Sequence, residues 1–241
     1  MLLNSIYPTF QGEVNAFGIG SPALFIRLQG CPIRCYKRTL GILCDTPEAL
    51  KKPFAKSELN SIFAEVTKQS DQTKIKNICL TGGDPLWNDE KDIKELLQGL
   101  VDLDFNISIE TSGTIDWTPY TSISSNIFWV IDYKLKSAGI KNGTYLFKNY
   151  NNIKNLRSSD YIKFVIYDLD DLDEAVKVIR EFKNNTIATL SVGCFWGGKL
   201  STFDIFNRFK DEKLLGDIVI NMQTHKMAIA SDYKKEIPTN V

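Results

Sequence analysis

The stretch PALFIRLQGCPIRC, residues 22–35, joins an apolar run to a cysteine-bearing loop. The run at 22–30 has the length and the β-branched and aromatic content of a buried strand. The loop continues as far as Thr46, and three residues separate Cys31 from Cys35 while eight separate Cys35 from Cys44. The same arrangement, an apolar run that ends in glycine or polar residues, recurs along the chain and organises the expected fold.

Apolar runs alternate with segments of helical periodicity. We expect strands at 22–30, 75–83, 105–113, 127–135, 160–168, 186–194 and 218–226, and helices at 57–69, 92–103, 171–182 and 202–214. Ser57 is expected to cap the first helix, and the Asn- and Gly-containing region 136–159 is expected to be a long exposed loop. Strands that alternate with helices predict an α/β fold with mostly parallel strands, and the absence of a linker-like composition favours a single domain over 1–241.

Polar residues gather where these strands end. In parallel α/β folds the carboxyl ends of the strands meet at one rim, which is where such folds bind ligands. The expected strand ends carry Arg27 with the cysteine loop, TGGDP (81–85), ETSG (110–113), DYKL (132–135), Lys163 and QTHK (223–226). The sequence therefore predicts one site to which six strand ends contribute.

Composition limits the classes of function. The chain has 241 residues, 43% of them hydrophobic, and 29 basic residues balance 29 acidic ones. A net charge of zero gives no bulk attraction to nucleic acid or to a membrane surface. The beginning of the chain lacks the features of a signal peptide and no apolar run is long enough to cross a bilayer, so we expect a cytoplasmic protein. Cytoplasmic thiols stay reduced, and clustered cysteines there indicate metal binding or catalysis.

The three loop cysteines suit an iron–sulfur cluster better than structural zinc. A structural zinc site usually has four protein ligands, and the single histidine, His225, is distant in the sequence. Three thiolates leave one position of a cluster open. The alternative is three unrelated cysteines, because cysteine is often a small buried hydrophobic residue. That second interpretation is preferred for Cys79 and Cys194, which lie inside apolar runs.

Taken together, the cysteine loop, TGGDP and ETSG resemble the radical S-adenosylmethionine (SAM) superfamily. Its usual signature is CxxxCxxC; Cys31 and Cys35 match the first pair, and Cys44 stands six residues later than the signature places the third cysteine. The motifs FQGEV (10–14), GSPALFIRLQGCP (20–32), IETSGT (109–114) and MQTHK (222–226), with the CDT that closes the loop, resemble its 7-carboxy-7-deazaguanine synthase branch. Val14 stands where that family usually has Gly, and Asp84 where it usually has Glu.

The resemblance implies a fold, a reaction and a set of partners. The fold is a partial (β/α) barrel of the radical SAM type, with a cluster-binding loop at 31–46. The reaction is the conversion of 6-carboxy-5,6,7,8-tetrahydropterin to 7-carboxy-7-deazaguanine with loss of ammonia, in queuosine and other 7-deazapurine biosynthesis. The cofactors are a [4Fe-4S] cluster, SAM and Mg²⁺. The electron donor is of the flavodoxin or ferredoxin kind, and the protein is expected to be a homodimer.

The resemblance also assigns site residues, some of which have a physical rationale. Cluster ligands are Cys31, Cys35 and Cys44; the magnesium ligand is Thr46; SAM contacts are Gly82, Gly83, Asp84, Glu110, Ser112, Lys134 and Gln223; and substrate contacts are Gln11, Glu13, Arg27, Thr81 and His225. Glycines allow close approach of the backbone, and the planar guanidinium of Arg27 matches a carboxylate. Residues 36–43 are expected to form a turn or short helix that returns Cys44 to the other two cysteines.

Two other functions stay open at this point. One is an activating enzyme for a glycyl-radical protein, which would bind a protein rather than a pterin; FQGEV and MQTHK count against it. The other is a regulatory iron–sulfur or zinc protein without enzymatic activity. Binding of a pterin would distinguish a synthase from the activating enzyme, and cleavage of SAM would distinguish a synthase from the regulatory protein.

Overall fold

Eight strands form one curved sheet in which neighbours in space follow the order of the chain. The structure is a computed structural model that describes residues 1–41, 44, 46–51, 56–140 and 144–228. Strand β1 is antiparallel to β2, and every later pair is parallel. The strands are β1 (Leu3–Phe10), β2 (Pro22–Leu28), β3 (Asn77–Gly82), β4 (Asn106–Thr111), β5 (Ile127–Tyr133), β6 (Tyr161–Ile166), β7 (Thr189–Cys194) and β8 (Ile218–Ile220).

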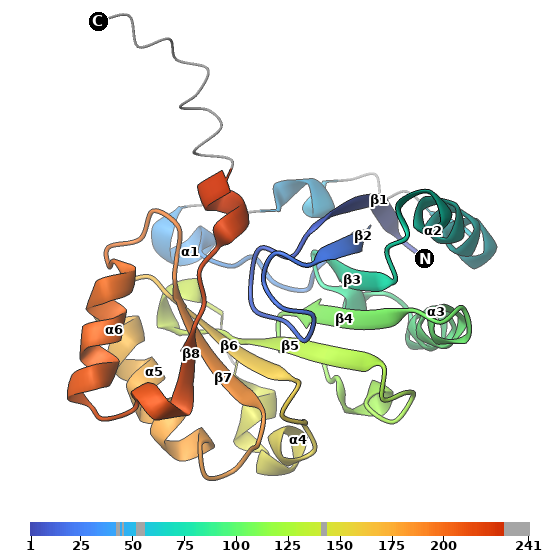
Figure 1. The fold of residues 1–241 in the computed structure, drawn as a ribbon. Coiled ribbons are helices and arrows are strands. Elements are labelled where there is room, and N and C mark those ends of the chain that lie inside the picture. The colour runs from blue at the N-terminus through green and yellow to red at the C-terminus, as the bar shows by residue number, and fades with distance from the viewer. Residues whose placement is uncertain (42–43, 45, 52–55, 141–143, 229–241) are drawn as a thin grey trace, which may run out of the picture.

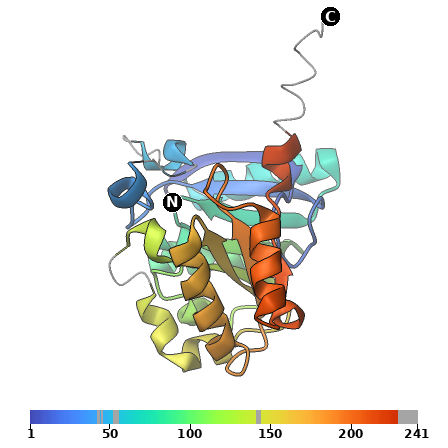
Figure 2. The same cartoon turned by 90° about the vertical axis from the view of Figure 1, so that its left-hand side faces the viewer.

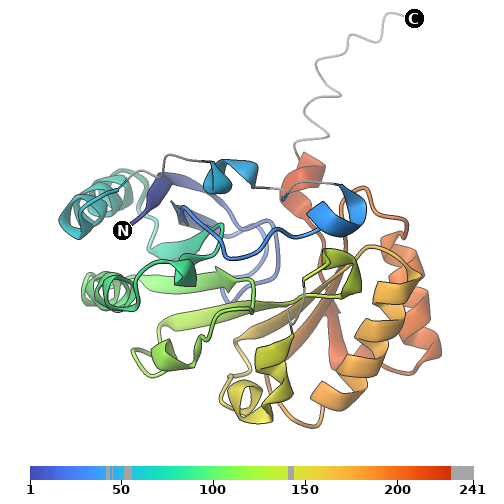
Figure 3. The same cartoon turned by 180° about the vertical axis from the view of Figure 1, so that it is seen from behind.

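Helices cover the outer face of this sheet (Figures 1 and 2). Seen from behind, the longer helices surround the strands on the same side (Figure 3). The helices are α1 (Lys37–Leu40), α2 (Leu59–Thr73), α3 (Glu90–Asp102), α4 (Tyr150–Lys154), α5 (Leu169–Phe182) and α6 (Thr202–Asp211). Among the described helices, none has the length and apolar character needed to cross a bilayer.

The sheet is a partial barrel, as expected from the sequence. β1 and β8 are its two edges, and within the described residues they do not pair with each other. The core lies between the sheet and the outer helices; Ile78 and Leu80 of β3 and Ile93 and Leu97 of α3 are fully buried in it. Burial of these side chains stabilises the layer by about 1.5–3 kcal/mol each. The mostly parallel α/β fold is therefore confirmed.

The segments that follow the two edge strands meet each other. The backbone N–H of Thr224 donates to the carbonyl of Gly12 at 2.9 Å, and the N–H of Val14 donates to Oδ1 of Asn221 at 3.0 Å. A Cβ added to Gly12 would lie 2.1 Å from Nδ1 of His225. Residues 11–14 and 221–225 thus lie side by side where the strands alone leave the barrel open.

Four local expectations were wrong or incomplete. Strand β1 was not expected, and it is the only antiparallel member among the described strands. Ser57 does not cap α2, because its backbone N–H donates to the carbonyl of Met1 and Glu58 takes the cap position. The last strand ends at Ile220, and residues 224–228 are helical rather than extended.

The fourth correction concerns region 136–159. Its described residues are not one exposed loop: they contain η4 (Lys136–Ala138), η5 (Tyr145–Lys148) and α4. Phe147 and Ile153 are buried, and the Phe147 ring lies against Trp117 and Tyr133. These apolar side chains close the outside of the barrel between β5 and β6. Residues 141–143 lie outside the described part of the chain.

Candidate active site

A cavity of about 400 Å³ opens at the carboxyl ends of the strands. This volume suits a small-molecule ligand. All six expected strand ends contribute to its lining, with Arg27, Thr81, Glu110, Asp132, Lys163 and His225. The prediction that these ends meet in one site is confirmed, although His225 comes from a helical segment beyond β8.

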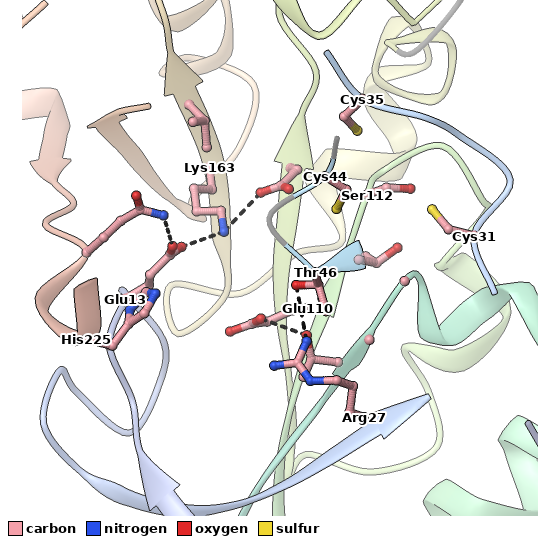
Figure 4. A pocket seen from close by; sticks show the side chains of 18 of the residues that line it. Glu13, Arg27, Cys31, Cys35, Cys44, Thr46, Glu110, Ser112, Lys163 and His225 are labelled. Carbon is pink, nitrogen blue, oxygen red and sulfur yellow. Dashed lines mark hydrogen bonds and ion pairs between the residues drawn. The ribbon is translucent and has the colours of Figure 1, made fainter. Parts of the chain in front are cut away.

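Three cysteines form one side of the cavity, called here the cysteine wall: Cys31, Cys35 and Cys44. None of the three is in a disulfide, and Figure 4 shows their side chains around the same pocket. Burial raises the pKa of the Cys31 thiol to about 12, so binding of a metal must displace its proton. Within the described residues, no group of three or more His, Cys, Asp or Glu side chains is arranged as a metal site. The ligand role of the three cysteines stays a prediction.

A short helix shapes the wide interval between the second and third cysteines. Helix α1 occupies Lys37–Leu40, between Tyr36 (φ 63°) and Gly41 (φ 67°). Both flanking residues are left-handed, which reverses the chain within a few residues. The expected short helix is therefore confirmed, and Cys44 lines the same cavity as the other two cysteines. Ile42, Leu43 and Asp45 lie outside the described residues.

Gly82 and Gly83 line the cavity next to the cysteine wall. Gly82 has φ +144°, and a Cβ there would lie 2.0 Å from the carbonyl oxygen of Leu28. A Cβ on Gly83 would lie 2.2 Å from the carbonyl oxygen of Gly30. Glycine is required at both positions because any side chain would collide with the backbone of residues 28–30. The missing side chains also leave this backbone open to the cavity.

Asp84 supports the site from behind and does not line the cavity. It is fully buried, and its carboxylate accepts hydrogen bonds from the N–H of Leu86 (3.0 Å), the hydroxyl of Thr111 (3.1 Å) and both the N–H (3.0 Å) and the hydroxyl of Ser112. Burial raises the pKa of Asp84, although these hydrogen bonds act to lower it. Ser112 and Thr111 are the lining residues, and Asp84 fixes their orientation.

Opposite the cysteine wall lies a charged group, called here the polar wall: Glu13, Asp132, Lys163, Gln223 and His225. Nζ of Lys163 is 2.7 Å from Oε2 of Glu13 and 3.2 Å from Oδ1 of Asp132. Nε2 of Gln223 donates to Oε1 of Glu13 at 2.5 Å. Burial alone would raise the pKa of Glu13, but the charge of Lys163 and the bond from Gln223 lower it to about 2. Glu13 is thus a buried carboxylate that stays ionised at neutral pH.

A second cation joins Asp132 to the cysteine side. Nζ of Lys134 lies 2.5 Å from Oδ2 of Asp132, so Asp132 contacts both Lys134 and Lys163. Burial lowers the pKa of each lysine, and the neighbouring carboxylates raise it above its ordinary range. Both lysines therefore stay charged in the cavity.

Between the two walls lie Glu110 and Thr81. The hydroxyl of Thr81 donates to Oε2 of Glu110 at 3.0 Å, and burial raises the pKa of Glu110. Gln11 is almost fully buried beside them, and its Nε2 has no hydrogen-bond partner among the described residues. A buried donor without a partner costs about 1–3 kcal/mol, which a ligand acceptor would recover.

Arg27 faces the cavity from β2. Nη2 donates to the hydroxyl of Tyr7 at 3.0 Å, and Nη1 donates to Oγ1 of Thr46 at 3.3 Å (Figure 4). Among the described residues, no carboxylate forms an ion pair with this guanidinium. A half-buried guanidinium whose hydrogen bonds within the described residues go to neutral hydroxyls is suited to an anionic ligand.

The sequence did not point to some of the lining residues. Tyr7 and Thr9 belong to the unexpected strand β1, where alternate residues face the cavity. Phe195 and Trp196 follow β7, and the ring of Phe195 lies 4.6 Å from that of Tyr36 in the cysteine loop. The sequence signal that could have indicated Tyr7 and Thr9 is their spacing of two residues from each other and from Gln11, which places all three on one face of a strand.

An open α/β barrel whose strand ends join three loop cysteines to a polar wall has the architecture of radical SAM enzymes. No family model matches the chain. The 7-carboxy-7-deazaguanine synthase of Clostridium acetobutylicum is 31% identical over 218 residues, covering 89% of this chain and 91% of that protein. The enzymes of the same name from Thermoplasma acidophilum (34% identical, 76% and 78% covered) and Leptospira interrogans (29%, 93% and 93%) are also similar.

A solved structure, that of QueE from Escherichia coli, has the same fold. Its TM-score is 0.64 at 20% identity, with 92% of this chain and 93% of that chain covered. The chain belongs to the 7-carboxy-7-deazaguanine synthase family, and it is an enzyme of that type.

Proposed function

We propose that this enzyme converts 6-carboxy-5,6,7,8-tetrahydropterin to 7-carboxy-7-deazaguanine with loss of ammonia, as a step of queuosine and other 7-deazapurine biosynthesis. One observation carries the proposal: the cysteine wall, the Arg27 guanidinium, which can bind a carboxylate, and the ionised Glu13, which can accept from ring N–H groups, line the same cavity. The cavity therefore has places for both a thiolate-bound cluster and a polar substrate that bears a carboxylate.

Cys31, Cys35 and Cys44 would hold a [4Fe-4S] cluster, because these three cysteines of one loop line the same cavity. Gly82, Gly83, Glu110, Ser112, Lys134 and Gln223 are the residues proposed to contact SAM. Cluster and SAM, when bound, supply the radical that removes a hydrogen atom from the substrate. The chain contributes the placement of the reacting groups and the exclusion of water.

The polar wall would hold the pterin ring. Glu13 is ionised and held by Lys163 and Gln223, so it can accept hydrogen bonds from ring N–H groups without moving. Gln11 offers its buried amide, and Thr81 and His225 complete the substrate contacts. Arg27 would bind the substrate carboxylate with two parallel hydrogen bonds.

Thr46 would place Mg²⁺ beside that carboxylate. Its hydroxyl oxygen lies 3.3 Å from Nη1 of Arg27, so a cation bound there would be close to a guanidinium. Two neighbouring cations repel unless an anion lies between them. The substrate carboxylate would serve as this anion, since Mg²⁺ usually takes few protein ligands and completes its shell with ligand oxygens and water.

Other parts of the proposal derive from the family alone. An external one-electron donor such as a flavodoxin or ferredoxin would reduce the cluster, and the enzyme would be a cytoplasmic homodimer built from one domain per chain.

The decisive experiment is anaerobic incubation of the reconstituted enzyme with SAM, a reductant and carboxy-tetrahydropterin, with mass spectrometry of the product. The expected result is 7-carboxy-7-deazaguanine and ammonia, with SAM regenerated at the end of each turnover. SAM cleavage without pterin binding would support an activating enzyme instead. A bound cluster without SAM cleavage would support a regulatory protein.

A further inference from the structure

The cysteine loop rests on a short segment that follows β5. The backbone N–H of Tyr36, directly after Cys35, donates to the carbonyl of Ala138 at 2.9 Å. The hydroxyl of Thr39, in α1, donates to the carbonyl of Ser137. Helix α1 is thus attached at two points to η4, the three-residue turn that follows Lys134 and Leu135.

A buried carboxylate holds η4 from the other side. Asp171 lies in the first turn of α5 and is completely buried. Its Oδ1 accepts from the N–H of Ser137 at 2.9 Å, and its Oδ2 accepts from the hydroxyl of Ser137 and from the N–H of Tyr167 at 3.0 Å. The carboxylate therefore satisfies both donors of Ser137 at once.

Capping of α5 does not explain Asp171. The N-cap of that helix is Asp168, whose Oδ1 accepts from the N–H of Asp171 at 3.2 Å. Asp170, also in the first turn, is exposed and pairs with Lys136 at 2.6 Å on the surface. Of these three carboxylates, Asp171 is the one whose side-chain oxygens bond to the backbone of η4.

We propose that Asp171 is a positioning residue for the cysteine loop. Its carboxylate holds Ser137 in place. The carbonyls of Ser137 and Ala138 in turn hold Thr39 and Tyr36, and Tyr36 follows Cys35 directly, so these contacts set the position of Cys35. The inference rests on the proposed function only in taking Cys35 as a cluster ligand. Because only Leu135 separates Lys134 from η4, the same carboxylate also limits the movement of the lysine proposed to contact SAM.

Thiol reactivity in the full chain without a cluster tests the positioning directly. Each cysteine is alkylated with iodoacetamide, and the rates are resolved by mass spectrometry of peptides. In Asp171→Ala and in Thr39→Val the rate at Cys35 should rise roughly fivefold to tenfold, since hydrogen-bonded contacts that restrain the loop are lost. The fully buried Cys79 should stay unreactive, and Asp170→Ala, the matched control, should equal the wild type.

A spectroscopic measurement complements the alkylation. After anaerobic reconstitution, Asp171→Ala should bind less iron and show an altered electron paramagnetic resonance spectrum. Asp171→Asn keeps one carbonyl acceptor for the N–H of Ser137, so its spectrum should be closer to that of the wild type.

An Asp171→Ala protein with native circular dichroism and an unchanged rate at Cys35 would overturn the proposal. If that variant does not fold, Thr39→Val, which leaves α5 intact, decides the matter, and an unchanged rate in it overturns the proposal equally. A wild-type chain that takes up no cluster would contradict the proposed function, while the alkylation comparison would still test the positioning.

Discussion

Nζ of Lys163 lies 2.7 Å from Oε2 of Glu13, an ion pair between residues 150 positions apart in the sequence. Asp132 approaches the same ammonium group at 3.2 Å. Lys163 is only 8% exposed, so its charge depends on these two carboxylates for compensation. The pair holds Glu13 in one place, which suits its proposed role as an acceptor for the substrate ring.

Replacement of Glu13 should change how stability depends on pH. Its pKa is about 2 in the folded protein against an ordinary value of 4.5. A lowered pKa contributes stability that is complete above about 4.5 and is lost as the pH falls toward 2. Glu13→Gln should therefore be less stable at pH 7, and its stability should fall less steeply over this acid range. Thermal unfolding across the range measures both effects. Glu95→Gln, at an exposed position of α3, should match the wild type, and an equal slope in Glu13→Gln would show that the pair contributes nothing.

The cluster ligands can be separated from the other thiols by substitution. Cys31→Ala, Cys35→Ala and Cys44→Ala should each abolish SAM cleavage, because each removes one of three thiolates. Cys79→Ala and Cys194→Ala are the controls and should keep the cluster, since Cys79 is buried in β3 and the Cys194 thiol contacts Thr202. Iron content and deoxyadenosine formation are the measurements. Full iron loading and activity in Cys44→Ala would remove it from the ligand set.

Recognition of the substrate carboxylate by Arg27 is expected to depend on the planar shape of the guanidinium as well as on its charge. Arg27→Ala should lower kcat/KM for the pterin by an amount equivalent to about 3–5 kcal/mol, the cost of leaving a buried carboxylate unpaired. Arg27→Lys keeps the charge without the fork and should lose less. Tyr7→Phe, which removes one hydroxyl acceptor of Arg27, is a further comparison and should lose less than Arg27→Ala. Steady-state kinetics with parallel SAM titrations test this, and an Arg27→Ala enzyme with normal kcat and KM would exclude the carboxylate role.

Thr46→Ala should act through magnesium. The substitution removes one hard oxygen beside Arg27 and leaves the proposed SAM contacts intact. We expect the Mg²⁺ concentration needed for half-maximal activity to rise, while the dissociation constant of SAM stays the same. Titration of activity with Mg²⁺ and calorimetry with SAM give the two numbers. A change in SAM affinity without a change in metal dependence would contradict the assignment.

The glycine turn after β3 should tolerate no side chain. In Gly83→Ala the new Cβ would lie 2.2 Å from the carbonyl oxygen of Gly30, so the backbone must shift. We expect a loss of stability of about 1–3 kcal/mol, as for other overpacked sites. Gly216→Ala is the matched control, because no atom lies within 4 Å of the Cβ position there. Denaturant unfolding of both variants compares them; equal stability would mean that the turn can relax.

The fold was predictable where a strand is buried on both faces. Ile78 and Leu80 on one face and Cys79 on the other are all fully buried, which gives β3 a continuous apolar run, and the other parallel strands show similar runs. Strand β1 escaped prediction because it is half exposed and contains Pro8, which is compatible with an edge strand but weakens the signal. The helical segment at 224–228 escaped because its place depends on a hydrogen bond to the distant Gly12.

The site was predictable as a set of residues but not as a set of contacts. The rule that polar residues gather at the ends of parallel strands selects Arg27, Glu110 and Lys163. It does not show that the Asp84 side chain points away from the cavity and binds Ser112, because that depends on the conformation of the turn after β3. Nor does it pair Glu13 with Lys163, since the segment after β1 reaches β6 only when the barrel curves.

The meeting of residues 11–14 with residues 221–225 has a consequence for synthesis on the ribosome. Gln223 is translated 210 residues after Glu13, so a nascent chain already carries all the described strands, β8 included, before the polar wall can be complete. Contacts of such long range form slowly and after local ones. A product of interrupted translation would therefore keep much of the barrel yet lack Gln223 and His225, and the emerging enzyme acquires its substrate pocket only when elongation has passed them.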